Sequence, residues 1–149
     1  MYAICNLGIV PLRAKPSDQS EMINQILFGE CFTILEKEKY WSKVKLSFDD
    51  YEGYVDNKQF EEISEDEFYK LKDNNPIYSG EYIDFIKSHN NYFLTIPLGA
   101  RLPYFSNNNF LLNSTKFSFE GTIFSGKLPK SEIIQKAYIF LNTPFLWGG

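Results

Sequence analysis

The chain contains few residues of the kinds that carry out covalent or metal chemistry. Its 149 residues include one histidine, His89, and two cysteines, Cys5 and Cys31. Two cysteines are too few for a disulfide framework, and neither belongs to a Cys-x-x-Cys motif. A single histidine and two isolated thiols do not supply the four ligands of a typical zinc site. We therefore expect no metal site and no cofactor.

The same scarcity argues against a catalytic centre in this stretch of sequence. A cysteine nucleophile needs a base such as imidazole beside it to take up the thiol proton. His89 lies in the polar segment Lys87-Ser88-His89-Asn90-Asn91, which reads as a solvated loop, and both cysteines lie among strand-like residues. Free cysteine is among the most buried residue types. We expect two inert thiols and no catalytic residue.

The chain also lacks a basic excess and any long apolar run. It has 15 lysine and arginine residues against 19 aspartate and glutamate residues, a formal net charge of −4. A protein with this net negative charge does not attract the negatively charged phosphate backbone of a nucleic acid, so we expect no nucleic-acid partner. No segment approaches the length of a membrane span, and no signal peptide precedes the first apolar residues. We expect a cytoplasmic protein, or an exported one if Met1 is not the true N-terminus.

The residues that are abundant favour strands. Aromatic residues make up 17% of the chain, with 14 phenylalanines and 10 tyrosines, and flat rings pack well on pleated surfaces. A half-buried strand is predicted where polar Lys43, Lys45 and Ser47 alternate with apolar Val44, Leu46 and Phe48. Turn residues follow at Asp49-Asp50 and also occur at Lys15-Pro16-Ser17-Asp18. Residues 1–63 therefore predict a small barrel of short strands.

A short helix and a second strand-rich unit follow. Ser64-Glu65-Asp66-Glu67 has the pattern of a capping box, which predicts a helix over 64–72 within a connector of residues 64–75. Residues 76–127 are again rich in strand-forming residues separated by turns. Gly29 is followed by Gly53 after 24 residues, and Gly99 is followed by Gly121 after 22. This spacing predicts a second copy of the barrel, although glycine is common in strand-rich chains.

The last residues, 128–149, predict a helix and a turn. Ser131 is a suitable N-cap, and Pro144 is expected to stop the helix. An apolar stripe runs along it, formed by Ile133, Ile134, Ala137, Tyr138 and Leu141. We expect this stripe to be poorly covered in isolation. The turn after the helix reads Thr143-Pro144-Phe145-Leu146-Trp147-Gly148-Gly149.

Several motifs resemble those of a known family. They are Leu12-Arg13-Ala14, Pro16-Ser17, Leu27-Phe28-Gly29-Glu30, Trp41 and Tyr51-Glu52-Gly53-Tyr54-Val55. Together they resemble the bacterial SH3-like domain that precedes NlpC-type cell-wall cysteine peptidases, and Gly99-Ala100-Arg101-Leu102-Pro103 resembles a divergent second copy. The C-terminal helix and aromatic-x-aromatic-Gly-Gly turn resemble the start of the catalytic domain. The resemblance implies a mainly β fold of two tandem SH3-like barrels joined by a short helix, then one helix of a catalytic domain truncated before its cysteine.

The resemblance also implies a recognition site. Such enzymes cut γ-D-glutamyl-diamino-acid bonds in cell-wall stem peptides, and an acid and a tyrosine of the first barrel recognise the free amino terminus of L-alanine. By motif position these residues are Glu30 and Tyr51. The second barrel has Ala100 and Phe119 at the corresponding positions, so the polar pair exists in only one copy. The alternative is that Glu30 is a solvated turn residue and Tyr51 an ordinary barrel aromatic.

Three functions remain open at this stage. The first is the substrate-recognition half of a stem-peptide cysteine endopeptidase, lacking its nucleophile here and therefore inactive alone. Phe145, which stands where the family usually has a tyrosine near the nucleophile, would weaken even a completed enzyme. The second is a stand-alone module that binds wall peptides, and the third is a protein-binding SH3-like module. The sequence does not determine the diamino acid of the substrate or the oligomeric state.

Overall fold

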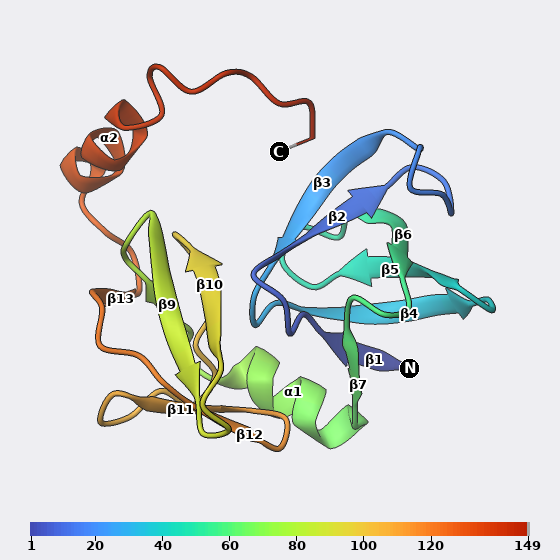
Figure 1. Cartoon of the computed structure of the whole chain (residues 1–149), viewed down its shortest axis with the longest axis horizontal. Helices are drawn as coiled ribbons and strands as arrows, with labels where there is room; N and C mark the ends of the chain where they lie inside the picture. Colours follow the sequence, from blue (N-terminus) through green and yellow to red (C-terminus); the bar gives the residue numbers. More distant parts are fainter. Residues whose placement is uncertain (149) are drawn as a thin grey trace.

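The computed structural model of the chain describes residues 1–148. These residues form thirteen strands, all paired antiparallel in three sheets, and two helices (Figure 1). The fold is mainly β, as the aromatic and alternating sequence predicts. Neither helix has the length and apolar character that would be needed to cross a membrane.

The first sheet contains seven strands in the order β3-β2-β6-β5-β4-β1-β7. They are β1 Tyr2–Ile4, β2 Ile9–Arg13, β3 Met22–Leu27, β4 Cys31–Lys37, β5 Trp41–Leu46, β6 Glu52–Asp56 and β7 Glu61–Ile63. One side of this sheet encloses an apolar cluster that includes Val10, Phe32, Val44 and Val55, all fully buried or nearly so. We call residues 1–63 the first unit.

Strand β5 follows the predicted alternation only as far as its last residue. Ser42, Val44 and Leu46 are buried, and the residues between them are half-buried. The strand ends at Leu46 because the chain then turns through Asp50, whose φ is 60°. Phe48 lies beyond the strand and is 85% exposed. Its interpretation as a buried strand residue was wrong.

Helix α1, Glu65–Asp73, follows the first sheet. The Ser64 side chain accepts a hydrogen bond of 3.1 Å from the Glu67 amide, which confirms Ser64 as the predicted N-cap. Phe68 and Leu71 are the buried residues of the helix. Arg101, from the second strand-rich half of the chain, donates to the Leu71 carbonyl oxygen at the C-terminus of the helix, where orphan carbonyl groups favour a cation.

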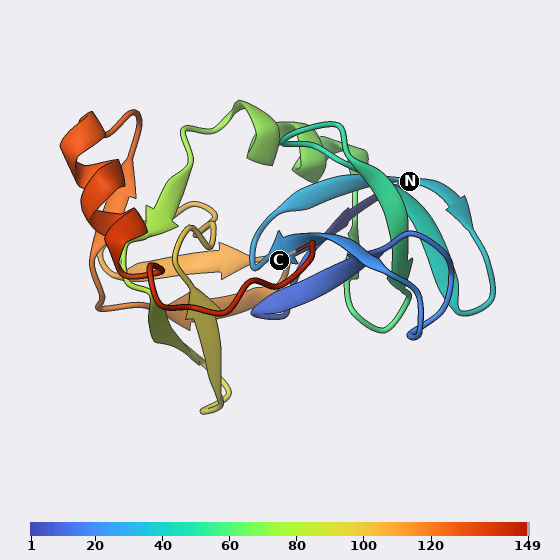
Figure 2. The ribbon, with the colours of Figure 1, turned by 90° about the horizontal axis from the view of Figure 1, so that it is seen from above.

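The remaining strands form two smaller sheets, of order β10-β9-β12-β11 and β13-β8. They are β8 Ile77–Ser79, β9 Ile83–Ser88, β10 Phe93–Pro97, β11 Asn109–Leu112, β12 Thr115–Ser118 and β13 Ile123–Ser125. We call residues 76–127 the second unit. Figure 2 shows its sheets beside the first unit. Helix α1 connects the two units in the chain.

The turns at Gly29 and Gly99 are built alike. Their φ angles are 79° and 83°, values that glycine adopts without strain. Four backbone hydrogen bonds of the first turn recur in the second. In the first turn they are Gly29 N to Cys5 O, Cys5 N to Glu30 O, Glu30 N to Leu27 O and Phe28 N to Gly8 O. In the second turn the matching bonds, in the same order, are Gly99 N to Ser79 O, Ser79 N to Ala100 O, Ala100 N to Pro97 O and Leu98 N to Tyr82 O. The other predicted pair differs, because Gly53 lies within β6 whereas Gly121 lies between β12 and β13.

The two turns also contact each other. The Arg101 amide donates to the Phe28 carbonyl oxygen at 2.8 Å, and a Cβ atom added to Gly29 would overlap the Arg101 carbonyl oxygen. Below the turns, one apolar cluster includes Ile4, Phe28 and Cys31 of the first unit together with α1 and most of the second-unit core. Its aromatic centre is formed by Phe28, Phe110 and Phe117, with ring centroids 5.3 to 5.9 Å apart. The two units therefore share a core.

Helix α2, Lys130–Tyr138, lies at the outer side of the second unit, and the chain then runs back over the first (Figures 1 and 2). The helix ends six residues before Pro144, through tighter turns in which Phe140, Leu141 and Thr143 bond three residues back. It has no buried residue. Its main attachments are the Tyr82 hydroxyl, which donates to Lys136 O at 3.1 Å, and Lys136 Nζ, which donates to Gly80 O at 2.7 Å.

Candidate functional site

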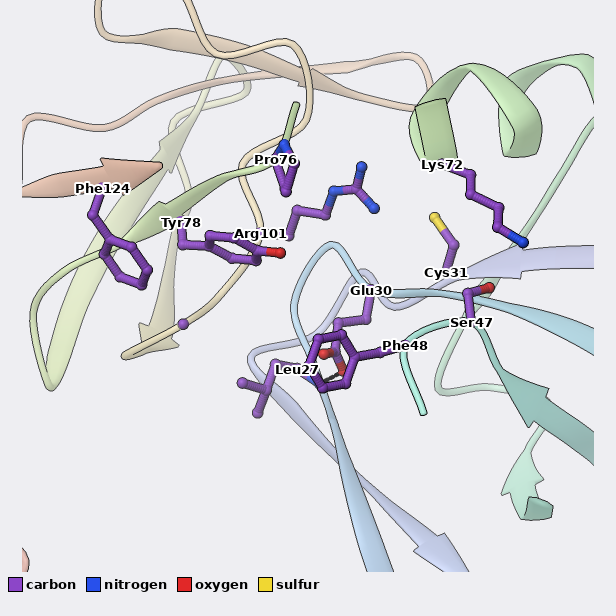
Figure 3. A pocket seen from close by; sticks show the side chains of 11 residues that line it. Leu27, Glu30, Cys31, Ser47, Phe48, Lys72, Pro76, Tyr78, Arg101 and Phe124 are labelled. Atoms are coloured by element: carbon purple, nitrogen blue, oxygen red, sulfur yellow. Dashed lines mark hydrogen bonds between the residues drawn. The ribbon is translucent and has the colours of Figure 1, made fainter. Parts of the chain in front are cut away.

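A cavity of about 560 Å³ opens between the two units (Figure 3). Its wall combines aromatic rings with charged groups from both units and α1. The lining residues are Leu27, Glu30, Cys31, Ser47, Phe48, Lys72, Pro76, Tyr78, Gly99, Arg101 and Phe124. Cavities of this size and mixed character are typical of sites for small ligands.

Glu30 is the acidic group of this wall. The turn brings its carboxylate back onto the chain, where Oε2 accepts from the Leu27 amide at 2.8 Å. Burial raises the pKa of the Glu30 carboxyl above its ordinary value of 4.5, while the Leu27 amide opposes that rise. None of the ion pairs among residues 1–148 involves Glu30. Glu30 thus presents a half-buried carboxylate without a cationic side chain paired to it, which suits it to receive a ligand cation.

A second cavity, of about 430 Å³, adjoins Glu30 on the side of the C-terminal segment. It is lined by Ile23, Asn24, Gln25, Leu27, Glu30, Leu46, Phe48, Asp49 and Gly148. The C-terminal segment is held there by Trp147, whose Nε1 donates to the Glu21 carboxylate. Leu27, Glu30 and Phe48 therefore separate two hollows, one facing the second unit and one facing the end of the chain.

Phe48 is a site residue that the sequence interpretation missed. It lines both cavities, as Glu30 does, and Figure 3 shows both side chains in the wall of the larger one. An aromatic ring exposed to this degree beside a carboxylate gives a ligand cation an apolar wall as well as a charge. The signal that could have found Phe48 is the Asp49-Asp50 turn, since a strand that stops before a turn loses its alternation.

Tyr51 lies in the turn after β5, where its carbonyl oxygen accepts from the Leu46 amide at 2.9 Å. It precedes β6, its amide donates to Asp49 Oδ1 at 3.1 Å, and its side chain is 46% exposed. Tyr51 does not line either cavity beside Glu30. Phe48 is the aromatic residue of the first unit that lines both cavities together with Glu30, and a role for Tyr51 stays a prediction.

The two cysteines are buried, and His89 does not line either of the two cavities beside Glu30. Cys5 and Cys31 are buried free thiols, and burial raises the pKa of each to about 12. Cys31 reaches the wall of the larger cavity, yet a thiol with so high a pKa holds its proton at neutral pH. His89 is exposed on the second unit. Among residues 1–148, no group of three acidic, histidine or cysteine side chains is arranged to hold a metal ion.

Comparisons with known proteins agree with this architecture. Residues 12–60 match a family model described as the bacterial dipeptidyl-peptidase SH3 domain. No curated protein matches the chain. A solved structure of an NlpC/P60 family protein from Bacillus cereus ATCC 10987 superimposes with a TM-score of 0.78 at 16% identity, covering 100% of this chain and 66% of that one. The chain thus spans slightly less than two thirds of that protein. Residues 12–60 are similar to a bacterial SH3 domain, and the whole chain is similar in fold to about two thirds of an NlpC/P60 family protein.

Proposed function

We propose that this chain is the substrate-recognition region of a cell-wall peptidase of the NlpC type. In this proposal both units are SH3-like barrels in tandem, joined by α1, and α2 begins a catalytic domain. In this proposal the chain supplies no cysteine nucleophile, because both thiols are buried and burial raises the pKa of each to about 12. Its role is to hold a stem peptide for a catalytic domain that follows Gly149.

The placement of the Glu30 carboxylate supports this proposal most directly. Glu30 lies on the wall that faces the C-terminal segment, close to where a catalytic domain would continue. One oxygen is fixed by the Leu27 amide, so the carboxylate is oriented before any ligand arrives. The free ammonium of an N-terminal L-alanine is a cation that such a group would bind, and Phe48 would cover its methyl group.

The test compares peptides that differ only in this ammonium group. A catalytic domain is fused in frame after Gly149, and cleavage of L-Ala-γ-D-Glu-diaminopimelate is compared with cleavage of the N-acetylated peptide. A hydrogen bond between charged groups contributes about 1.5–3 kcal/mol, so Glu30→Gln is expected to lower kcat/KM for the free amine about ten- to hundredfold. The acetylated peptide, already a poor substrate, should be little affected.

Glu38→Gln is the matched control, since Glu38 is an exposed glutamate in the β4–β5 turn. It should leave both substrates unchanged. Tyr51→Phe and Phe48→Ala then separate the two aromatic candidates: the variant that lowers cleavage of the free-amine peptide identifies the partner of Glu30. If Glu30→Gln lowered kcat/KM equally for both peptides, Glu30 would not be the group that recognises the free amine.

A further inference from the structure

The last part of the chain, α2 and the C-terminal segment after it, is attached to the rest of the molecule at two places. Among residues 130–148, every residue is exposed except Lys136 and Gly148, which are half-buried. Lys136 marks the attachment to the second unit. Gly148 marks an attachment to the first unit beside the start of β3, toward which the segment returns in Figures 1 and 2. The proposed peptide recognition does not by itself explain this second attachment.

The first contact at the second attachment joins two side chains. The indole Nε1 of Trp147 donates to the carboxylate of Glu21, the residue before β3. A hydrogen bond to an ionised acceptor is stronger than one between neutral groups. None of the ion pairs among residues 1–148 involves Glu21, so no basic side chain pairs with this carboxylate in place of the indole. Glu21 therefore holds the C-terminal segment through the indole N–H group.

The second contact is a close approach of two backbones. Gly148 has a φ of 74°, and a Cβ atom added there would overlap the Met22 carbonyl oxygen. Strand β3 lies at the edge of its sheet, which leaves room for another segment beside it. Glycine is needed at position 148 both for its φ and for this close approach.

These contacts bring the end of the C-terminal segment to the Glu30 carboxylate. Gly148 lines the cavity of about 430 Å³ together with Glu30 and Phe48. Residues that continue the chain after Gly148 therefore start at the cavity where the substrate ammonium is proposed to bind. Without the contacts of Trp147 and Gly148, the nearest remaining attachment is Lys136 in α2, which leaves the end of the segment free to move away from Glu30.

We propose that Glu21 is a positioning residue for the domain that follows the C-terminal segment. Glu21 acts through Trp147 and does not touch the substrate. By holding Trp147 it keeps the start of that domain at the Glu30 cavity, so that an amine bound by Glu30 lies at a fixed distance from the bond to be cut. Small misplacements of a substrate are costly for catalysis. The inference rests on the proposed function and adds the residue that aligns its two halves.

The contact is tested in the chain itself by following the indole N–H resonances of Trp41 and Trp147, with Trp41 as the internal reference. Glu21→Ala should shift the Trp147 resonance and speed its exchange with water about tenfold, because it removes a charged acceptor. Glu21→Gln keeps a neutral acceptor and should have a smaller effect. Glu120→Ala, at an exposed glutamate of the second unit, should change neither resonance. A Trp147 resonance unmoved by Glu21→Ala would overturn the proposal.

Gly148→Ala and Gly126→Ala are a matched pair for the backbone contact. Gly126 has a similar φ of 68°, but no atom lies within 4 Å of a Cβ atom added there. Both variants carry the strain of a left-handed conformation, and only Gly148→Ala should shift the Trp147 resonance as Glu21→Ala does. If Gly148→Ala left that resonance in place, the segment would not be held against β3, and the proposal would fail.

The positioning role is tested in the fused enzyme with the free-amine and N-acetylated peptides. Glu21→Ala should lower the preference for the free amine about five- to tenfold, and Glu21→Gln should lower it less. A general loss of stability would lower cleavage of both peptides and would not change this preference. In a Trp147→Phe background, which lacks the N–H donor, Glu21→Ala should have no further effect.

The same assay separates this inference from the proposed function. If Glu30→Gln abolishes the preference for the free amine and Glu21→Ala leaves it unchanged, the positioning role of Glu21 is refuted and the proposed function stands. If Glu30→Gln itself leaves the preference unchanged, the proposed function is refuted, and the positioning role is refuted with it.

Discussion

Alanine substitutions at Gly29 and Gly99 would measure how strongly the two units are packed together. The two glycines occupy equivalent turns with nearly the same φ, 79° and 83°. They differ in what a new methyl group would meet. At Gly99 the nearest atom is Leu27 Cδ1 at 3.7 Å, an ordinary contact, whereas at Gly29 the methyl group would overlap the Arg101 carbonyl oxygen. Gly99→Ala is therefore a built-in control for Gly29→Ala.

The expected magnitudes follow from the two separate costs. A non-glycine residue in the left-handed region costs about 1–2 kcal/mol, which both variants incur. Overpacking adds about 1–3 kcal/mol, and only Gly29→Ala incurs it, since the Arg101 backbone must move away and stretch its bond to Phe28. An additional loss of about 2 kcal/mol corresponds to a further fall in Tm of about 4–8 °C for a chain of this length.

The assay is thermal and urea unfolding of the three proteins, followed by circular dichroism. Hydrogen exchange of the Arg101 amide supplies a local readout, because its partner is the Phe28 carbonyl oxygen. We expect faster exchange at Arg101 in Gly29→Ala than in Gly99→Ala. Equal losses of stability in the two variants would refute the reasoning, because the shared φ would then account for the whole effect.

Three further predictions concern Glu30, the two thiols and helix α2. Burial raises the pKa of the Glu30 carboxyl above 4.5, so ionisation of Glu30 destabilises the folded state. Glu30→Gln should therefore be more stable to urea than the wild type at pH 7. The free energies of unfolding of the two proteins should become equal as the pH falls below 4.5. Cys5 and Cys31, with pKa values of about 12, should resist iodoacetamide in the native state and react together on unfolding, as mass spectrometry would detect; rapid native labelling of either would contradict their burial. Helix α2, which has no buried residue, should exchange its amides much faster than β4 and β5, and equal protection in a monomer would contradict this.

The sequence predicted local features better than contacts between distant segments. Ser64 was identified as an N-cap because its partner is only three residues away, which is short-range chemistry that a linear pattern contains. The mainly β class followed from the same kind of evidence. The glycines at 29 and 99 were matched by their spacing to Gly53 and Gly121, and the likeness of their turns includes backbone bonds to residues distant in sequence, such as Cys5 and Ser79.

The site depended on contacts that no local pattern encodes. Phe48 was placed inside the first barrel because alternation was extended beyond the end of the strand, and its position beside Glu30 depends on where β5 stops. Arg101 belonged to a motif of the second unit, yet its side chain reaches α1 and its amide reaches Phe28. Glu30 was found by motif position, but its half-buried setting between two cavities required the fold.

The core shared between the units has a consequence for how such modules are inherited. Ile4, Phe28 and Cys31 belong to the first unit by sequence, but they pack with the residues that stabilise the second. A gene fragment that encoded residues 76–127 alone would leave Phe110 and Phe117 without the ring of Phe28 against them. Recombination that exchanged only one of the two units would break this cluster. We therefore expect the second unit to be inherited together with α1 and the first unit, whereas the first unit also has a core of its own.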